Sequence, residues 1–200
     1  MTKSVPIYLE LDEIRAMLDQ AQNERERLIV LTLFKTGVRV SELVHIRVEH
    51  LDLDKKELMV VKGKGKKDRV VDLDDQLIAE LISFLAGRRR GYLFESPIVL
   101  GLTVELARDP DYSRPLTTRA VHLLVKRLAE RAGVEKAKPV SPHVLRHSYA
   151  CHLLKSGVRL ITVQKLLGHS SLSITQVYLE AIATRSEVKE DVRNNPLPEV

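Results

Sequence analysis

The stretch that decides the fold is "SPHVLRHSYACHLLKSG", residues 141–157. It predicts one helix with a defined start and a defined end. Ser141 is suited to the N-cap, Pro142 to the first helical position, and Gly157 to the position just past the last turn. The polar side chains of this helix need interaction partners, and these must come from other parts of the sequence.

The first turns of this helix carry an unusual set of polar side chains. His143 and Arg146 are three residues apart, so they lie on one face. Both are near the helix start, where free backbone N–H groups and the helix dipole favour an anion. Taken singly, a histidine here is more often a packing residue, and an arginine more often forms a salt bridge. Only a second set of residues elsewhere in the chain makes a functional interpretation worthwhile.

A metal site is the first alternative for this helix. His143 and His147 have the i, i+4 spacing of a zinc-binding helix, but the metalloprotease pattern requires Glu directly after the first His. That position is Val144, and no compact carboxylate cluster is close in sequence. We therefore expect no metal and no other cofactor.

Composition is that of an ordinary globular domain. The chain has 200 residues, of which 44% are hydrophobic, enough to bury a core in one domain. Cys151 is the only cysteine, so neither an internal disulfide nor a cysteine metal cage is expected. No run approaches the ~18 to 20 apolar residues that a membrane helix needs. The start, "MTKSVPIYLELDEI", lacks the apolar block of a secretory signal. We expect a cytoplasmic protein.

The basic residues are clustered. The net charge is +5, which permits a polyanionic partner without proving one. "KGKGKKDR" covers residues 62–69, and "GRRRG" covers residues 87–91. Either run alone is more often a solvated loop.

Hydrophobic spacing predicts a mainly helical chain with one small antiparallel sheet, an α+β fold. Residues 39–46 read as a short helix with Ser41 as its N-cap. Residues 57–61 and 68–73 read as the two strands of a hairpin with a basic, glycine-containing tip. Residues 88–115 contain three prolines and predict no regular element. The other predicted helices are residues 10–22, 24–37, 74–87, 117–133, 160–169 and 173–183.

Six residues in a fixed order then form a pattern. Arg39 stands just past a helix end in "TGVRVSEL", and Lys64 stands on the hairpin tip. His169 lies in "LLGHSS", and Tyr178 lies in "TQVYLE". With His143 and Arg146 in "HVLRH", these residues resemble the catalytic domain of tyrosine recombinases, the phage-integrase family, and most closely its Xer-like branch. The resemblance runs from about residue 6 to about residue 183.

The resemblance implies a reaction and a nucleophile. Members cut one DNA strand with a tyrosine hydroxyl, forming a 3′-phosphotyrosyl bond and a free 5′-hydroxyl that is later exchanged. One phosphoester replaces another, so ATP and metal are not required. Tyr178 corresponds to the nucleophile. His143 corresponds to the position credited with general-base assistance, which suits an imidazole that titrates near neutrality.

The resemblance also implies how charge is handled. Arg39 and Arg146 correspond to the arginines that hold the non-bridging phosphate oxygens, and His169 to a third donor. Lys64 corresponds to the hairpin lysine that protonates the departing 5′-oxygen, although the neighbouring lysines blur that assignment. Glu42 resembles the acid that orients the first arginine.

Further basic residues are expected to contact DNA. On the hairpin these are Lys62, Lys66, Lys67 and Arg69, as phosphate contacts that make affinity depend on salt. On the predicted helix 117–133 they are Arg119, Lys126 and Arg127, most of whose contacts would be to phosphate. Double-stranded DNA is therefore the expected partner.

The ends of the chain differ from those of a usual family member. Residues 1–10 resemble the junction that leads into the catalytic domain, and we expect the separate N-terminal DNA-clamping domain to be absent from these 200 residues. This fits either a truncated chain or a naturally minimal recombinase. Residues 179–200 form a tail with an apolar stripe, which in relatives packs on a neighbouring protomer. We expect dimers and tetramers on DNA through exchange of this tail, and a monomer when free; the alternative is that the stripe folds back on its own core.

Two other functions stay open from the sequence. A type IB topoisomerase-like activity would use the same chemistry and reseal the same strand. A non-catalytic DNA-binding module could use the same scaffold, although it would have no need for a nucleophile.

Overall fold

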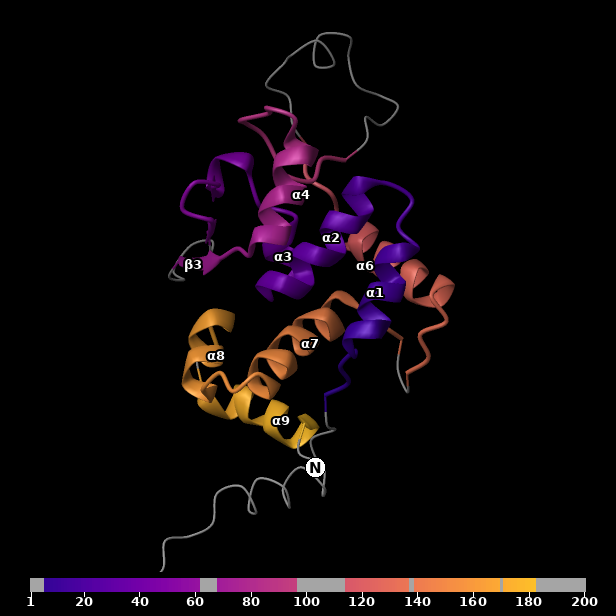
Figure 1. Cartoon of the computed structure of the whole chain (residues 1–200), viewed down its shortest axis with the longest axis vertical. Helices are drawn as coiled ribbons and strands as arrows, with labels where there is room; N and C mark the ends of the chain where they lie inside the picture. The colour runs from indigo at the N-terminus through magenta and orange to yellow at the C-terminus, as the bar shows by residue number, and fades with distance from the viewer. Residues whose placement is uncertain (1–5, 62–67, 97–113, 137–138, 170, 183–200) are drawn as a thin grey trace, which may run out of the picture.

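The computed structural model describes residues 6–61, 68–96, 114–136, 139–169 and 171–182. The architecture is mainly helical with one small antiparallel sheet, as the sequence predicts (Figure 1). The helices are α1 (Leu11–Asp19), α2 (Glu24–Thr36), α3 (Val40–Leu43), the 3-10 turn η1 (Val48–His50), α4 (Asp75–Leu85), α6 (Thr118–Arg131), α7 (Pro142–Lys155), α8 (Leu160–Leu167) and α9 (Leu172–Ile182). The strands are β1 (Leu51–Asp52), β2 (Glu57–Val60) and β3 (Arg69–Asp72).

Helix α7 has α2 on one side and α8 and α9 on the other (Figure 1), and it contributes residues to two apolar clusters. The larger cluster joins α1, α2, α4, α6 and the sheet, and it reaches the start of α7 at Leu145. The smaller cluster joins the middle of α7, at Ala150 and Cys151, to Leu167 of α8 and Tyr178 of α9. The start of α7 therefore packs in the larger cluster, and its middle packs in the smaller cluster together with the segment that carries Tyr178.

The sheet has the strand order β1-β2-β3, and both pairs are antiparallel. In the β2–β3 pair, Val60 lies opposite Arg69. Burial alternates along β2, because Leu58 and Val60 face the core while Met59 between them is 44% exposed. The hairpin is confirmed, but its tip, residues 62–67 with the predicted Lys64, lies outside the described residues.

Helix α7 begins as predicted, with Ser141 at the N-cap and Pro142 in the first turn, but the Ser141 side chain makes no capping hydrogen bond. The side chains of Asp74 and Thr117 accept the backbone N–H groups of Leu77 and Ala120 at the starts of α4 and α6. Helix α3 differs from the prediction, because its N-cap is Arg39 and Ser41 lies inside the helix. The prediction that Ser41 caps it is wrong. The N–H of Arg39 donates instead to the Glu42 carboxylate, at 2.8 Å.

Residues 91–95, unassigned from the sequence, run back along residues 46–48. The N–H of Val48 donates to the carbonyl of Gly91 at 2.9 Å, and the N–H of Leu93 donates to the carbonyl of Ile46 at 2.8 Å. Leu93 and Phe94 are each 1% exposed, so this segment belongs to the core. The sequence does not indicate the role of residues 95–114, and most of them, residues 97–113, lie outside the described residues.

Candidate active site

Arg146 joins three parts of the chain. It lies in the second turn of α7 and is 3% exposed. One of its Nη atoms donates to the carbonyl of Gly37 at the end of α2, and the other donates to the carbonyl of Leu167 at the end of α8, at 2.7 Å. A cation at the C-terminal carbonyls of two helices is a favourable arrangement. Burial, followed by the nearby charge of Arg39, lowers the pKa of Arg146 to about 10, so the guanidinium stays charged at pH 7.

Gly37 is required at the junction that Arg146 grips. Its φ of +60° lies in the left-handed region, which disfavours residues with a Cβ. A Cβ at this position would also overlap the ring of Tyr149, lying 2.8 Å from Cε1. The close approach of the Tyr149 ring therefore sets the path of the chain between α2 and α3, and with it the positions of the Gly37 carbonyl and of Arg39 two residues later.

Arg39 is held from behind by Glu42. The carboxylate of Glu42 accepts the backbone N–H of Arg39 at 2.8 Å and its Nη1 at 3.2 Å. The Arg39 side chain remains 37% exposed, whereas that of Glu42 is 9% exposed. This arrangement leaves N–H groups of the first predicted phosphate-binding arginine available to solvent or to a ligand.

Arg69 is placed differently from the sequence-based prediction. It was expected to contact DNA phosphate, but its side chain is only 9% exposed and bonds to protein. Two parallel hydrogen bonds, at 2.9 and 2.8 Å, join it to the Glu42 carboxylate, and its Nε donates to the carbonyl of Leu166 at 3.0 Å. In the described residues, Arg69 therefore links β3, α3 and the end of α8, and the prediction of a phosphate contact is corrected to an internal one.

The Glu42 carboxylate is strongly stabilised in its charged form. Burial alone would raise the pKa of this group, but the hydrogen bonds from Arg69 and from the Arg39 backbone, with the charges of both arginines, outweigh it. The net result lowers the pKa of Glu42 to about 2.

His169 and Tyr178 reach the same region from the end of α8 and from α9. The rings of His169 and Tyr178 are stacked, with centroids 6.3 Å apart. Nδ1 of His169 is 3.0 Å from the hydroxyl of Thr175. Tyr178 is 2% exposed, and its hydroxyl is 3.0 Å from Nδ1 of His147. His147 was considered in the sequence only as a metal ligand; its spacing from His143 placed it on the correct face, but nothing in the sequence indicated its contact with Tyr178.

The site is cationic, and its histidines are neutral at pH 7. Burial, followed by the charges of His143 and Arg146, lowers the pKa of His147 to about 4. Burial, followed by Arg146 and Arg39, lowers the pKa of His169 to about 4. Burial raises the pKa of the Tyr178 phenol, although Arg146 and Arg39 act in the opposite direction. The phenol therefore carries its proton until a partner accepts it.

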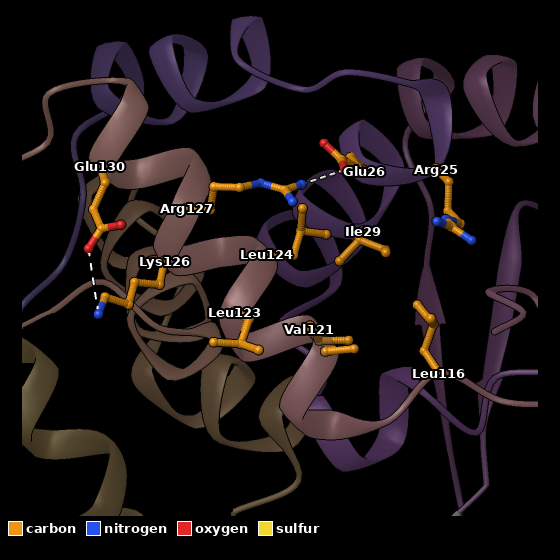
Figure 2. A pocket seen from close by; sticks show the side chains of 11 residues that line it. Arg25, Glu26, Ile29, Leu116, Val121, Leu123, Leu124, Lys126, Arg127 and Glu130 are labelled. Atoms are coloured by element: carbon orange, nitrogen blue, oxygen red, sulfur yellow. Dashed lines mark hydrogen bonds and ion pairs between the residues drawn. The ribbon is translucent and has the colours of Figure 1, made fainter. Parts of the chain in front are cut away.

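The α6 residues that were expected to contact DNA lie in or near a groove that is separate from the region around Tyr178. A groove of about 540 Å³ lies between α2 and α6, with Leu123 59% exposed beside it (Figure 2). Arg127 is paired with Glu26 across this groove, and Lys126 lies 3.6 Å from Glu130 on its own helix. Arg119 is exposed in the first turn of α6. None of the residues that converge near Tyr178 lines this groove, so it does not mark the reactive region.

Two further observations concern the described residues alone. They contain no group of three or more His, Cys, Asp or Glu side chains arranged to hold a metal ion. None of their helices is both long enough and apolar enough to cross a membrane.

Comparison of the sequence with known proteins identifies relatives of this chain. The sequence profile of the Phage integrase family matches residues 8–185. Tyrosine recombinase XerA of Thermococcus kodakarensis is 41% identical over 178 residues, which cover 88% of this chain and 58% of that protein. Tyrosine recombinase XerA of Pyrococcus horikoshii is 36% identical over 199 residues, 98% of this chain and 64% of that protein. Tyrosine recombinase XerD of Staphylococcus aureus is 34% identical over 194 residues, 94% of this chain and 62% of that protein.

Solved structures agree with these relatives. A crystal structure of XerA recombinase superposes with a TM-score of 0.77 at 29% identity, covering 98% of this chain and 68% of that one. The XerH site-specific recombinase in a post-cleavage complex with palindromic difH substrate superposes with a TM-score of 0.72 at 25% identity, covering 96% and 54%. The chain thus spans about three fifths of the length of the relatives that it matches in sequence.

Proposed function

The chain belongs to the phage integrase family, and from this premise we propose that it is a site-specific DNA recombinase. It would cleave and rejoin strands of double-stranded DNA through a 3′-phosphotyrosyl intermediate on Tyr178, without metal or ATP. Relatives of known name are tyrosine recombinases, and XerH has been solved on its DNA substrate.

One observation carries the proposal: the Tyr178 hydroxyl contacts His147, the Tyr178 ring stacks on that of His169, and the charges of Arg146 and Arg39 act on the phenol. Arg146 bonds to carbonyls two residues before Arg39 and two residues before His169, so all three lie in one region. The imidazoles of His147 and His169 both contact the Tyr178 ring. A DNA-binding module has no physical need for such a group around a phenol.

The proposed step conserves the number of phosphoester bonds. The Tyr178 oxygen attacks the scissile phosphorus, the bond to the 5′-oxygen breaks, and the departing oxygen takes up a proton. Negative charge spreads over the non-bridging oxygens, so positioning and electrostatics supply most of the catalysis. Arg39 and Arg146 would hold those oxygens, with His169 as a third donor. His143, exposed on α7, would assist removal of the phenol proton. Loss of one charged donor typically costs about 3 kcal/mol, roughly a hundredfold in rate.

Tyr178 must be uncovered before it can attack. Tyr178 is 2% exposed, so most of its side chain is covered by protein. We therefore propose that DNA binding shifts α9 relative to α7. We also propose that Lys64 donates the proton to the leaving oxygen, while Lys62, Lys66 and Lys67 contact phosphates; all four lie outside the described residues.

A covalent-capture experiment tests the proposal. The chain is incubated with a pool of duplexes that have a randomised core and a nick placed so that the cleaved 5′-end diffuses away and religation fails. DNA retained on the denatured protein is sequenced. We expect adducts from the native chain, none from Tyr178→Phe, and adducts from the matched control Tyr149→Phe, which keeps its ring against Gly37. If no duplex is retained by the native chain, the non-catalytic module is the better description.

A second assay separates recombination from topoisomerase-like activity. Two labelled duplexes that carry the captured sequence are mixed with the chain. Recombination produces strands with exchanged ends, whereas topoisomerase-like activity only relaxes a supercoiled plasmid. The Xer-type relatives favour exchange.

Exchange between two duplexes requires more than one protomer. We propose a monomer when free and dimers or tetramers on DNA, assembled through the tail, residues 179–200. Leu179, at its start, is 41% exposed, and Ile182 packs on the smaller cluster; residues 183–200 lie outside the described part of the chain. Light scattering with and without the captured duplex measures this. A DNA substrate also favours a cytoplasmic location.

A further inference from the structure

The carboxylate of Glu42 is shared unequally between two arginines. Arg69 donates two side-chain hydrogen bonds to it, from Nη1 to Oε1 at 2.9 Å and from Nη2 to Oε2 at 2.8 Å. The guanidinium of Arg39 donates one, from Nη1 to Oε1 at the longer distance of 3.2 Å, and the second bond from this residue comes from its backbone N–H. The fork of Arg69 therefore occupies both carboxylate oxygens, whereas the Arg39 guanidinium shares only one of them.

The exposure of these three side chains differs in the same direction. The side chains of Arg69 and Glu42 are each 9% exposed, and that of Arg39 is 37% exposed. Opposite charges attract most strongly where water is excluded, so the carboxylate is mainly neutralised by Arg69. The more exposed guanidinium of Arg39 is left with most of its positive charge for an incoming anion.

We propose that Arg69 is a positioning residue for strand cleavage, which neutralises Glu42 so that Arg39 keeps its charge and its N–H groups for the scissile phosphate. This inference rests on the proposed function and adds a part to it. In this role Arg69 acts through Glu42 and not through a contact of its own with DNA.

The consequence of losing Arg69 follows from the burial of Glu42. A buried carboxylate without a partner is costly, and the cation still in contact with it would be Arg39. The carboxylate would draw the Arg39 guanidinium into the two-bond geometry that Arg69 now has. N–H groups of Arg39 would then face protein, and its charge would be cancelled. The phosphate would meet a weaker donor.

The charge of Arg69 also acts on other groups of the candidate site. Burial is the first cause that lowers the pKa of Arg146 and of His169, and the charge of Arg69 is a further cause for both. Arg69 is thus close enough to influence the electrostatics of the site, although its side chain is bonded to protein. Because negative charge grows on the phosphate oxygens during the reaction, compensation of Glu42 favours the transition state.

Arg69 has a connecting role as well as a charge. Its Nε donates to the carbonyl of Leu166 at the end of α8, at 3.0 Å. Loss of the whole side chain would therefore change both the connection between β3, α3 and α8 and the charge balance at Glu42. A variant that keeps the cation but loses the planar fork distinguishes the two effects, because lysine carries a point charge and cannot form the paired bonds.

The first test compares Arg69→Met with Arg69→Lys on the nicked duplex recovered by covalent capture. Single-turnover cleavage is measured at saturating DNA and expressed per folded molecule, with the folded fraction taken from urea unfolding. We expect Arg69→Met to be roughly tenfold to a hundredfold slower, the upper limit being the loss of one charged donor. Arg69→Lys should stay within about fivefold of the native rate. Equal losses in the two variants, or a native rate in Arg69→Met, would overturn the inference.

Arg27 provides a matched control. It forms a similar fork with Glu80, at 3.1 and 3.2 Å, and this fork joins α2 to α4. Arg27→Met removes an arginine–carboxylate pair that is not part of the candidate site, and its cleavage rate per folded molecule should equal that of the native chain. A loss as large as that of Arg69→Met would point to general loosening of the fold and contradict the proposed role.

The second test removes the charge that Arg69 compensates. In a Glu42→Gln background there is no carboxylate to neutralise, so Arg69→Met should change cleavage by less than about threefold. The double variant should also cleave faster than Arg69→Met alone. A further loss of about tenfold or more in the double variant relative to Glu42→Gln would rule the inference out. This comparison holds even if Arg69→Met alone does not fold, because the double variant leaves no unpaired buried carboxylate.

A neutral substrate gives an independent measurement. A methyl group in place of one non-bridging oxygen removes the negative charge of the scissile phosphate, so the charge of Arg39 contributes less. The native chain should then exceed Arg69→Met by a smaller factor than on the ordinary duplex. An undiminished factor would show that Arg69 does not act through charge. Absence of any adduct from the native chain on ordinary duplexes would instead overturn the proposed function, and this inference with it.

Discussion

At the scale of single residues, Gly37 determines where Arg146 can lie. Its carbonyl accepts one end of the guanidinium, and its backbone combines a positive φ with the close approach of Tyr149. Gly133 has a similar φ of +66°, but a Cβ at that position would meet no atom within 4 Å. Substitution of Gly133 tests backbone strain alone, whereas substitution of Gly37 tests backbone strain together with crowding against Tyr149.

We predict that Gly37→Ala destabilises the chain by about 2 kcal/mol or more, through left-handed strain and overlap with Tyr149. Cleavage by the molecules that still fold should fall about a hundredfold, because the carbonyl that positions Arg146 moves. Gly133→Ala should lose only about 1 kcal/mol, with normal cleavage. Urea unfolding and the rate of adduct formation measure both effects. Equal cleavage by the two variants would contradict this role of Gly37.

Glu42 gives a pH dependence with a defined window. Its pKa is about 2 in the folded chain and 4.5 ordinarily, so the unfolded chain binds the proton first as pH falls. The stabilisation is complete above about pH 4.5 and is lost between there and pH 2; for a shift of this size it amounts to about 3 kcal/mol. His147 and His169, each with a pKa lowered to about 4, act at higher pH and lose their contribution as pH falls from 6.5.

We predict that the difference in unfolding free energy between the native chain and Glu42→Gln is large at pH 6 and shrinks by about 3 kcal/mol toward pH 2, since a protonated carboxyl and an amide are both uncharged. The free energy of unfolding of both chains, measured by urea unfolding at pH 6, 4 and 3, checks this prediction. A difference that stays constant with pH would show that the Arg69–Glu42–Arg39 contacts do not depend on the charge of Glu42.

At the scale of elements, α7 carries residues of the candidate site on one face and packs against the segment before α1 with another. One carries His143, Arg146 and His147. The other holds the segment before α1: the hydroxyl of Ser148 accepts the N–H of Leu9 at 2.8 Å, and Nε2 of His152 is 2.8 Å from the Leu9 carbonyl. Because both faces are in contact with protein, apolar residues are not confined to one side of this helix.

We predict that Ser148→Ala costs about 1–3 kcal/mol, because the buried N–H of Leu9 is left without its acceptor. Cleavage by the folded fraction should be close to normal, since the opposite face of α7 is untouched. Ser156→Ala, at the exposed end of the same helix, should change stability by less than about 0.5 kcal/mol. Thermal unfolding and single-turnover cleavage measure these effects. A large loss of cleavage in Ser148→Ala would mean that the two faces are coupled.

The end of α8 is the second element on which the site depends. Its last two carbonyls, of Leu166 and Leu167, accept Arg69 and Arg146. The hairpin base, α3 and α7 are thus all connected to the helix end that precedes His169. Movement of α8 would therefore change the hydrogen bonds of both Arg69 and Arg146.

At the scale of the whole molecule, the sequence predicted what local spacing determines. The helices, the hairpin and the positions of Ser141 and Pro142 at the start of α7 follow from periodicity and capping alone. The two-residue strand β1 and residues 91–95 were missed, because their pairing partners are distant in sequence or their own patterns are short.

The same distinction applies to the site. Arg39, Arg146, His143 and His169 were selected by resemblance. The charges of Arg39 and Arg146 act on the Tyr178 phenol, the ring of His169 stacks on it, and His143 stacks on His147, which contacts it. The internal contacts of Arg69 and the His147–Tyr178 contact could not be foreseen, since each joins residues more than 25 positions apart. Arg69 lies next to the basic hairpin tip, so the sequence suggests a DNA contact; only the structure shows that its partner is the Glu42 carboxylate.

The central claim is that Tyr178, buried in the smaller apolar cluster, becomes covalently bound to DNA. The most direct measurement is mass spectrometry of protease-digested adducts formed on the nicked duplex. The account predicts a single modified peptide, with the 3′-phosphate of the cleaved strand on Tyr178. A nucleotide attached to any other side chain, or attached through a 5′-phosphate, would contradict it.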